Sequence, residues 1–215
     1  MKKFVAIILV VLSVWTFVAC VAKTPSTSQE NIEEDIKIDD NSMDLSHLMP
    51  VAVFEMSDGA TFEVELYKDI APITVKNFIK LAQNGFYNGT LIHRIVDSGI
   101  SIIQGGGYFL DQDNSRYTKP AENIYGEFTE NGFVNEFSHQ EGVISMARTP
   151  EEYNSASSQF FICYADCSGL DGSYATFGKV RSGMDVVKSI AKIAKGDMIK
   201  DDIIIKTVTI KYVQK

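Results

Sequence analysis

The fold of this chain is indicated by the stretch Ile92-His93-Arg94-Ile95 together with three short sequence blocks that follow it. Gln104-Gly105-Gly106 begins ten positions after Arg94. The later blocks are Ser158-Gln159-Phe160-Phe161-Ile162, then Leu170-Asp171-Gly172 with Phe177-Gly178-Lys179-Val180. No block is persuasive alone, but in this order between residues 92 and 180 they form a specific pattern.

The four blocks resemble the cyclophilin family of peptidyl-prolyl isomerases. The pattern of that family reads Phe-His-Arg, Gln-Gly-Gly, Ser-Gln-Phe-Phe-Ile, and Leu-Asp-Gly with Phe-Gly-Lys-Val. The resemblance implies a mainly β fold, an eight-stranded antiparallel β-barrel capped at each end by an α-helix. It also implies peptidyl-prolyl cis–trans isomerase activity without any cofactor.

Hydrophobic periodicity gives a compatible prediction from the residues themselves. Alternation predicts a hairpin of strands at 51–56 and 61–67, and a closing strand at 207–213. Apolar residues at helical spacing predict two helices, which begin near Pro72 and Met184. On this ground alone a barrel and a sandwich both stay open. Residues 105–140 show no sustained periodicity, which predicts a long functional or flexible loop.

The first twenty residues predict export. Lys2 and Lys3 precede an apolar run from 4 to 19 that is shorter than a spanning helix prefers, so residues 1–19 are interpreted as a signal peptide. Ala19 before Cys20 resembles the bacterial lipoprotein box, which implies lipidation of Cys20. An uncleaved anchor and a plain secretory signal are the alternatives. All three place the domain outside the cytoplasm, and the first predicts lipid anchoring to the bacterial cell membrane.

Residues 20–47 are predicted to be a flexible acidic tether, because too few apolar side chains are present to order it. We expect a single isomerase domain at 48–215, a length that suits one core. The net charge is −8, and loss of Lys2 and Lys3 on cleavage would make it −10. Such a chain repels phosphate backbones, so nucleic-acid binding is not expected. We expect a monomer.

Cys163 and Cys167 are the two cysteines of the predicted domain. A local disulfide would need the strand at Cys163 to turn back sharply, so two free thiols are predicted. No further ligand stands at zinc spacing. A calcium loop between Asp111 and Glu122 is disfavoured because Arg116 occupies the glycine position. No metal site is therefore predicted.

Rotation about an X-Pro bond faces a barrier of about 18–20 kcal/mol because the amide is conjugated. Lowering it needs a group that weakens this conjugation, and a guanidinium can donate to the prolyl nitrogen as the amide twists. Arg94 is therefore the candidate catalytic residue. Strand alternation predicts that His93 faces the other way, packed or hydrogen-bonded and without a catalytic role.

The resemblance implies the substrate-binding residues position by position. Phe161, Leu170 and Ile102 would line an apolar pocket for the proline ring. Tyr174 stands where many members have His or Tyr. Gln104 and Gln159 would hydrogen-bond the peptide backbone. The remaining predicted contacts are main-chain groups of Ala147 and Arg148. Phe160, the strand neighbour of Phe161, should point into the core.

Two departures from the family pattern bear on activity. The segment between Arg94 and Gln104 is two residues longer than usual, and the pocket Phe expected three positions before the Gln falls on Ser101. Ile100 would reach into the pocket instead, through a bulge, or the pocket would be shallower. The frequent Trp before Leu-Asp-Gly is Gly169, which removes an indole that many members use to hold cyclosporin.

The sequence thus predicts a lipid-anchored peptidyl-prolyl isomerase that assists the folding of exported proteins, with their proline-containing segments as partners. The first alternative is a non-catalytic peptide-binding module that uses the same groove, motivated by Ser101 and the longer segment. Arg94 distinguishes the two, because binding alone would not require it. An adhesin or structural lipoprotein would not explain Gln104, Gln159 and Phe161 at family spacing.

Overall fold

The computed structural model describes residues 47–193, 196–197 and 203–215, which belong to one compact unit, Asp44–Lys215. The predicted signal peptide, the lipidation site at Cys20 and nearly all of the acidic tether lie outside the described residues. In the described part of the chain, no helix is long and apolar enough to span a membrane.

The elements follow the chain in the order given by their bounds: β1 (Leu48–Met56), β2 (Thr61–Leu66), α1 (Pro72–Gln83), β3 (Thr90–Val96), β4 (Ile102–Gly105), β5 (Phe109–Leu110), β6 (Arg116–Tyr117), the 3-10 helix η1 (Thr129–Asn131), β7 (Val143–Met146), β8 (Phe160–Cys163), the 3-10 helix η2 (Ser168–Leu170), β9 (Thr176–Ser182), α2 (Met184–Ile193), β10 (Gly196–Asp197) and β11 (Ile203–Gln214).

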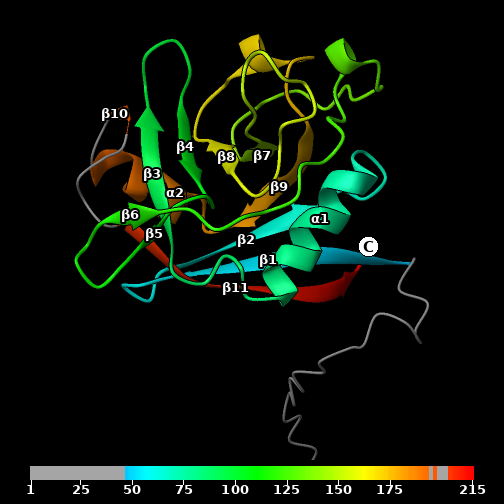
Figure 1. Ribbon diagram of the computed structural model, residues 1–215. Helices are drawn as coiled ribbons and strands as arrows, with labels where there is room; N and C mark the ends of the chain where they lie inside the picture. The colour runs from blue at the N-terminus through cyan, green and yellow to red at the C-terminus, as the bar shows by residue number, and fades with distance from the viewer. Residues whose placement is uncertain (1–46, 194–195, 198–202) are drawn as a thin grey trace, which may run out of the picture. The chain divides into compact units, whose positions relative to one another are not determined.

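Eight of these strands close into an antiparallel barrel in the order β3-β11-β1-β2-β9-β7-β8-β4, and β4 pairs back with β3. The two-residue β10 also pairs with β3, next to the stretch that pairs with β11. In Figure 1 the helices lie on different sides of the barrel, α1 on the right and α2 on the left. The predicted fold class is confirmed, and the sandwich is excluded.

The β1–β2 hairpin forms where the alternation predicted it. Its turn uses Asp58, whose Oδ1 accepts from the amide of Ala60 at 2.9 Å, and Gly59 at φ 86°. Along β2, alternate residues are buried. The outward-facing Glu63 meets Lys211 of β11 at 2.6 Å. One strand therefore supplies both the core and a charged outer surface.

The core is aromatic at its centre. Phe54, Phe78 and Phe160 pack together with ring centroids 5.6–6.2 Å apart. Phe160 is fully buried there, as predicted. A second, smaller cluster of buried residues consists of Ile102, Phe161, Cys163 and Cys167. It lies apart from the main core and supports the functional pocket described below.

The stretch from 105 to 140 contains structure that periodicity did not predict. Phe109 and Tyr117 face each other across the β5–β6 hairpin, with their rings stacked at 5.4 Å. Lys119 Nζ lies 4.0 Å from the Phe109 ring centroid.

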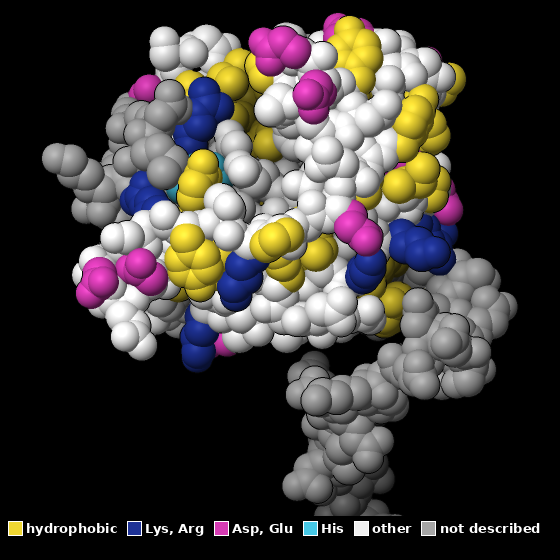
Figure 2. All heavy atoms as spheres, viewed as in Figure 1, with side chains coloured by type: hydrophobic (Ala, Val, Ile, Leu, Met, Phe, Trp, Pro, Cys, Tyr) yellow, Lys and Arg dark blue, Asp and Glu magenta, His cyan; other side chains and the backbone are white. Residues whose placement is uncertain are grey.

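Figure 2 shows one face of the molecule, on which basic and hydrophobic side chains alternate along the lower half. Neither the basic nor the acidic side chains form a continuous patch on this face.

Candidate active site

A pocket of about 470 Å³ opens between the barrel wall and the connections that follow β7 and β8. It is lined by His93, Arg94, Ile100, Ile102, Gln104, Tyr108, Ala147, Arg148, Pro150, Gln159, Phe161, Leu170 and Tyr174. All nine predicted catalytic and binding residues are among them. The structure therefore brings these positions together, and the role of each stays a prediction.

Arg94 of β3, Gln104 of β4 and Gln159, the residue before β8, form a hydrogen-bonded row. Arg94 Nη1 donates to Gln104 Oε1 at 3.2 Å, and Gln104 Nε2 donates to Gln159 Oε1 at 3.0 Å. Because a guanidinium only donates, it fixes the orientation of the first amide, and that amide fixes the second. A Cβ at Gly107 would overlap the Gln159 side chain, so glycine there leaves room for this row.

The apolar wall of the pocket combines strand and loop residues. Phe161 of β8 meets Tyr174 edge to face, with ring centroids 5.5 Å apart. Ile100 and Ile102 both line the pocket, whereas Ser101 between them binds Cys167: its amide donates to Sγ at 3.3 Å. Ile100 thus enters from the bend between β3 and β4 by simple alternation, and no register shift occurs in the β4 pairings beside it.

His93 corrects the expectation from strand alternation. The register of β3 against β4 shifts between Ile92 and Arg94, so His93 is an extra residue on β3. It lines the pocket beside Arg94 instead of facing away from it. A bulge changes the side to which a residue points, which the sequence of one strand does not reveal.

The imidazole of His93 is buried against Tyr108, with ring centroids 4.7 Å apart. Its Nδ1 has no hydrogen-bond partner in the described part of the chain. Burial lowers the pKa of His93 to about 4, and the positive charges of Arg116 and Arg94 act in the same direction. His93 is therefore a neutral group at neutral pH.

Arg148 is held by its side chain in a way that the sequence did not indicate. Its guanidinium donates to the carbonyl oxygens of Ser173, Thr149 and Pro150 at 2.9–3.0 Å. It also lies 4.9–5.0 Å from the ring centroids of Phe128, Tyr153 and Tyr174. The side chain thus fastens two parts of the pocket wall, Pro150 and Tyr174, to each other.

The main chain next to Arg148 makes the prediction for Ala147 more specific. The amide of Ala147 donates to Gln159 O at 2.9 Å. This amide is therefore committed within the protein, and the main-chain contact predicted at Ala147 is restricted to its carbonyl oxygen.

Cys163 and Cys167 are free and buried, as predicted. Burial raises the pKa of the Cys163 thiol, and the neighbouring Cys167 raises it further. Both side chains pack behind Ile102 and Phe161. They are part of the apolar support of the pocket, and the raised pKa of Cys163 keeps that residue a thiol.

Sequence reasoning did not assign Tyr108 or Pro150 to the pocket. Tyr108 follows the Gln104-Gly105-Gly106 block and Pro150 follows Arg148, so each lies within four positions of a residue that was assigned. Their proximity to the motifs was the available signal.

A family model described as cyclophilin type peptidyl-prolyl cis-trans isomerase/CLD matches residues 51–214. A peptidyl-prolyl cis-trans isomerase of Acinetobacter baylyi is 39% identical over 154 residues, which cover 69% of this chain and 76% of that protein. Peptidyl-prolyl cis-trans isomerase B of Escherichia coli is 35% identical over 161 residues, covering 68% and 92%.

The fold is matched by a crystal structure of a cyclophilin type peptidyl-prolyl cis-trans isomerase from Cryptosporidium parvum. It has a TM-score of 0.62 and 28% identity, and the match covers 76% of this chain and 98% of that one. A second structure of that protein, in the presence of the dipeptide Ala-Pro, matches with a TM-score of 0.60 and 30% identity over 75% and 98%. The chain therefore belongs to the cyclophilin-type peptidyl-prolyl cis–trans isomerase family.

Proposed function

We propose that this peptidyl-prolyl isomerase acts on proline-containing segments of exported proteins, with Arg94 as its catalytic group. The observation that carries the proposal is the presence of Arg94, Gln104 and Phe161 in one pocket. The pocket has apolar residues for a pyrrolidine ring and amides for a peptide backbone.

The chemistry follows from what a guanidinium can do. As the prolyl amide twists, its nitrogen gains lone-pair character and becomes a better hydrogen-bond acceptor. A donor held beside it then stabilises the twisted state more than either planar isomer, which lowers the barrier. The hydrogen bond to Gln104 anchors Arg94 for this task. The apolar side chains of Phe161 and Leu170 would hold the ring while the preceding carbonyl swings.

The rival proposal is a peptide-binding module without catalysis, which the missing Phe at position 101 suggests. Ile100 and Ile102 supply apolar surface to the same pocket, so the absence of that ring does not leave the pocket polar. This favours the catalytic proposal.

The extracytoplasmic role rests on residues 1–47. The charged start, the apolar run and Cys20 support lipid anchoring on the outer face of the cell membrane, and the acidic tether would hold the domain about 30 Å from the lipid headgroups. Clients would then be proteins that fold after export.

Exchange spectroscopy on a short Ala-Pro peptide tests the catalytic proposal. Arg94→Ala should reduce kcat/KM by about 10²–10³-fold while peptide affinity changes little, because the lost donor acts in the transition state. Phe161→Ala should weaken peptide affinity and lower kcat/KM by a similar factor, since its contact with the ring exists in every state. Wild-type exchange no faster than in buffer would favour the binding module, and undiminished exchange in Arg94→Ala would remove Arg94 from the mechanism.

A further inference from the structure

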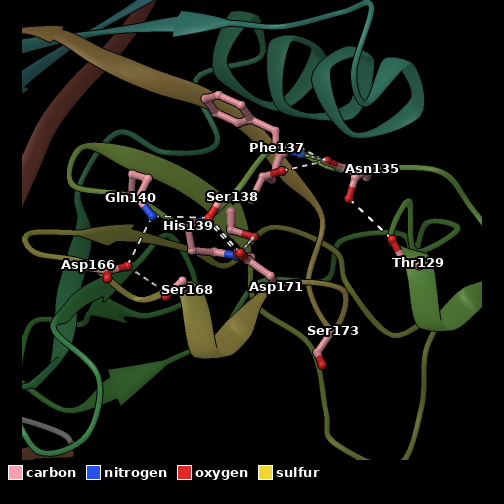
Figure 3. Close-up of polar contacts among 12 residues, drawn as sticks. Thr129, Asn135, Phe137, Ser138, His139, Gln140, Asp166, Ser168, Asp171 and Ser173 are labelled. Carbon is pink, nitrogen blue, oxygen red and sulfur yellow. Dashed lines mark hydrogen bonds and ion pairs between the residues drawn. The ribbon is translucent and has the colours of Figure 1, made fainter.

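His139 is a buried histidine outside the pocket lining whose two ring nitrogens are both engaged. Nδ1 lies 2.8 Å from Asp171 Oδ1, and Nε2 lies 3.2 Å from Ser145 Oγ. Asp171 also accepts from the His139 amide at 2.7 Å and from Ser138 Oγ at 2.6 Å. Figure 3 shows His139, Ser138 and Asp171 converging at this point.

The protonation state of this pair follows from its contacts. A carboxylate only accepts, so Nδ1 carries the hydrogen and Nε2 accepts from the hydroxyl of Ser145. Burial lowers the pKa of His139, and the hydrogen bond and charge of Asp171 only partly oppose this. The imidazole is therefore neutral, and the hydrogen bonds at its two nitrogens hold the ring in one orientation.

Three parts of the pocket wall are connected to the imidazole ring of His139. Its ring lies almost parallel to Phe161, at 12° with centroids 5.8 Å apart. Its partner Asp171 directly follows Leu170. Its other partner, Ser145, lies on β7 two positions before Ala147. Phe161, Leu170 and Ala147 all line the pocket, whereas His139 itself does not.

The connection that carries Leu170 is fastened to the same segment at further points. The amide of Cys167 donates to His139 O at 2.8 Å. Gln140 Nε2 donates to Asp166 Oδ1 at 3.3 Å, and Asp166 Oδ1 also accepts from the amide of Ser168 at 2.9 Å. Figure 3 shows Gln140 and Ser168 both in contact with Asp166.

We propose that His139 is a positioning residue of the isomerase, held by Asp171 and Ser145, which sets the relative placement of the pocket walls that receive the proline ring. This gives the Asp of the Leu-Asp-Gly block a function of its own. The proposal rests on the assignment of this pocket as the prolyl site.

The expected signature is a change in affinity. Apolar walls contact the ring in both isomers and in the twisted state, so misplacing them weakens all three interactions alike. Loss of the pair should therefore raise KM and leave kcat nearly unchanged. A loss of folded protein alone would instead lower the apparent kcat and leave KM unchanged.

Two substitutions at Asp171 separate geometry from charge. In Asp171→Asn the remaining oxygen can accept both His139 donors, and the new amide can donate to Ser138 Oγ, because a hydroxyl both donates and accepts. In Asp171→Ala every one of these contacts is lost. Val208→Ala is the matched control, since Val208 is buried in the main core on β11 and does not line the pocket.

The test measures KM and kcat on an Ala-Pro peptide with the whole protein in detergent, together with unfolding midpoints. We expect Asp171→Ala to raise KM at least about fivefold, Asp171→Asn to stay within about twofold of wild type, and Val208→Ala to keep the wild-type KM despite a lower midpoint. The Phe161 ring resonances should shift in Asp171→Ala and stay in place in Val208→Ala.

An unchanged KM in Asp171→Ala, or equal KM changes in Asp171→Ala and Val208→Ala, would overturn the positioning role while wild-type catalysis stands. If the pocket is not the prolyl site, the result differs from this one, because wild type itself would not accelerate cis–trans exchange of the peptide.

Discussion

At the scale of single residues, the pocket has Gly169 beside it, where many members of the family have a tryptophan. It lies in η2, one position before the pocket residue Leu170. A Cβ at Gly169 would have no heavy atom within 4 Å. The position therefore has open space where many members carry an indole.

This space predicts weak drug binding that can be restored. Wild type should bind cyclosporin at least about tenfold more weakly than Gly169→Trp, because one hydrogen bond and the packing of an indole contribute roughly 1–2 kcal/mol. Titration calorimetry on both proteins measures the difference. Nanomolar binding by wild type, or no gain in Gly169→Trp, would contradict the prediction.

The residue scale also shows what the sequence can predict. Arg94, Gln104, Gln159 and Phe161 were found because motif order fixes their places on paired strands. His93 was misplaced because a shift in pairing between two strands is a property of the pair and not of either sequence. The side chain of Arg148 was missed for a related reason. Its partners are carbonyl oxygens and rings that only the folded chain brings together.

At the scale of elements, the first amides of α1 are hydrogen-bonded by a residue that lies far away in the sequence. Its N-cap residue is Ala71, which provides no side-chain hydrogen bond. The fully buried Glu127 accepts from the amides of Ile73 and Thr74 at 3.0 and 2.7 Å. Pro72 and Gly85 predicted where the helix begins and ends, but no local pattern reveals a cap that lies 54 residues from Ile73.

Glu127→Gln should therefore destabilise the protein by about 2–3 kcal/mol, because an amide has one acceptor oxygen and no charge for the helix N-terminus. Glu122→Gln is the control: its ion pair with Lys80 is exposed and contributes at most about 1 kcal/mol. Urea unfolding followed by circular dichroism compares them. Equal losses in the two variants would refute the capping role.

At the scale of the whole molecule, the buried histidines link stability to pH. His93 has its pKa lowered from 6.5 to about 4, mainly by burial, and the pKa of His139 is lowered for the same reason. In the unfolded chain both titrate near 6.5. Below that pH the unfolded state binds protons that the native state does not, so stability falls as pH falls towards 4.

Between pH 7 and pH 5 this should cost about 2 kcal/mol for His93 alone. Urea unfolding at both pH values, on wild type and His93→Gln, measures it. The variant should lose about 2 kcal/mol less than wild type, and an equal decline would show that His93 does not carry the effect.

A prediction for the whole chain concerns its lipid anchor. Cys20→Ser should abolish incorporation of a tagged fatty acid and block processing of the leader, because the thiol is the predicted acylation site. Metabolic labelling followed by gel analysis checks this. Label retained by the serine variant would exclude the lipoprotein interpretation.

The pairing of β3 with β4 has a consequence for contact with unfolded chains. Unfolded chains expose strands that add to any free sheet edge, and such additions grow into aggregates. In the described part of the chain, each of the eight barrel strands has a paired strand on both sides, so free edges remain only at the two-residue β10 and at the β5–β6 hairpin. We therefore expect the eight barrel strands to offer unfolded chains no free edge on which an aggregate could grow.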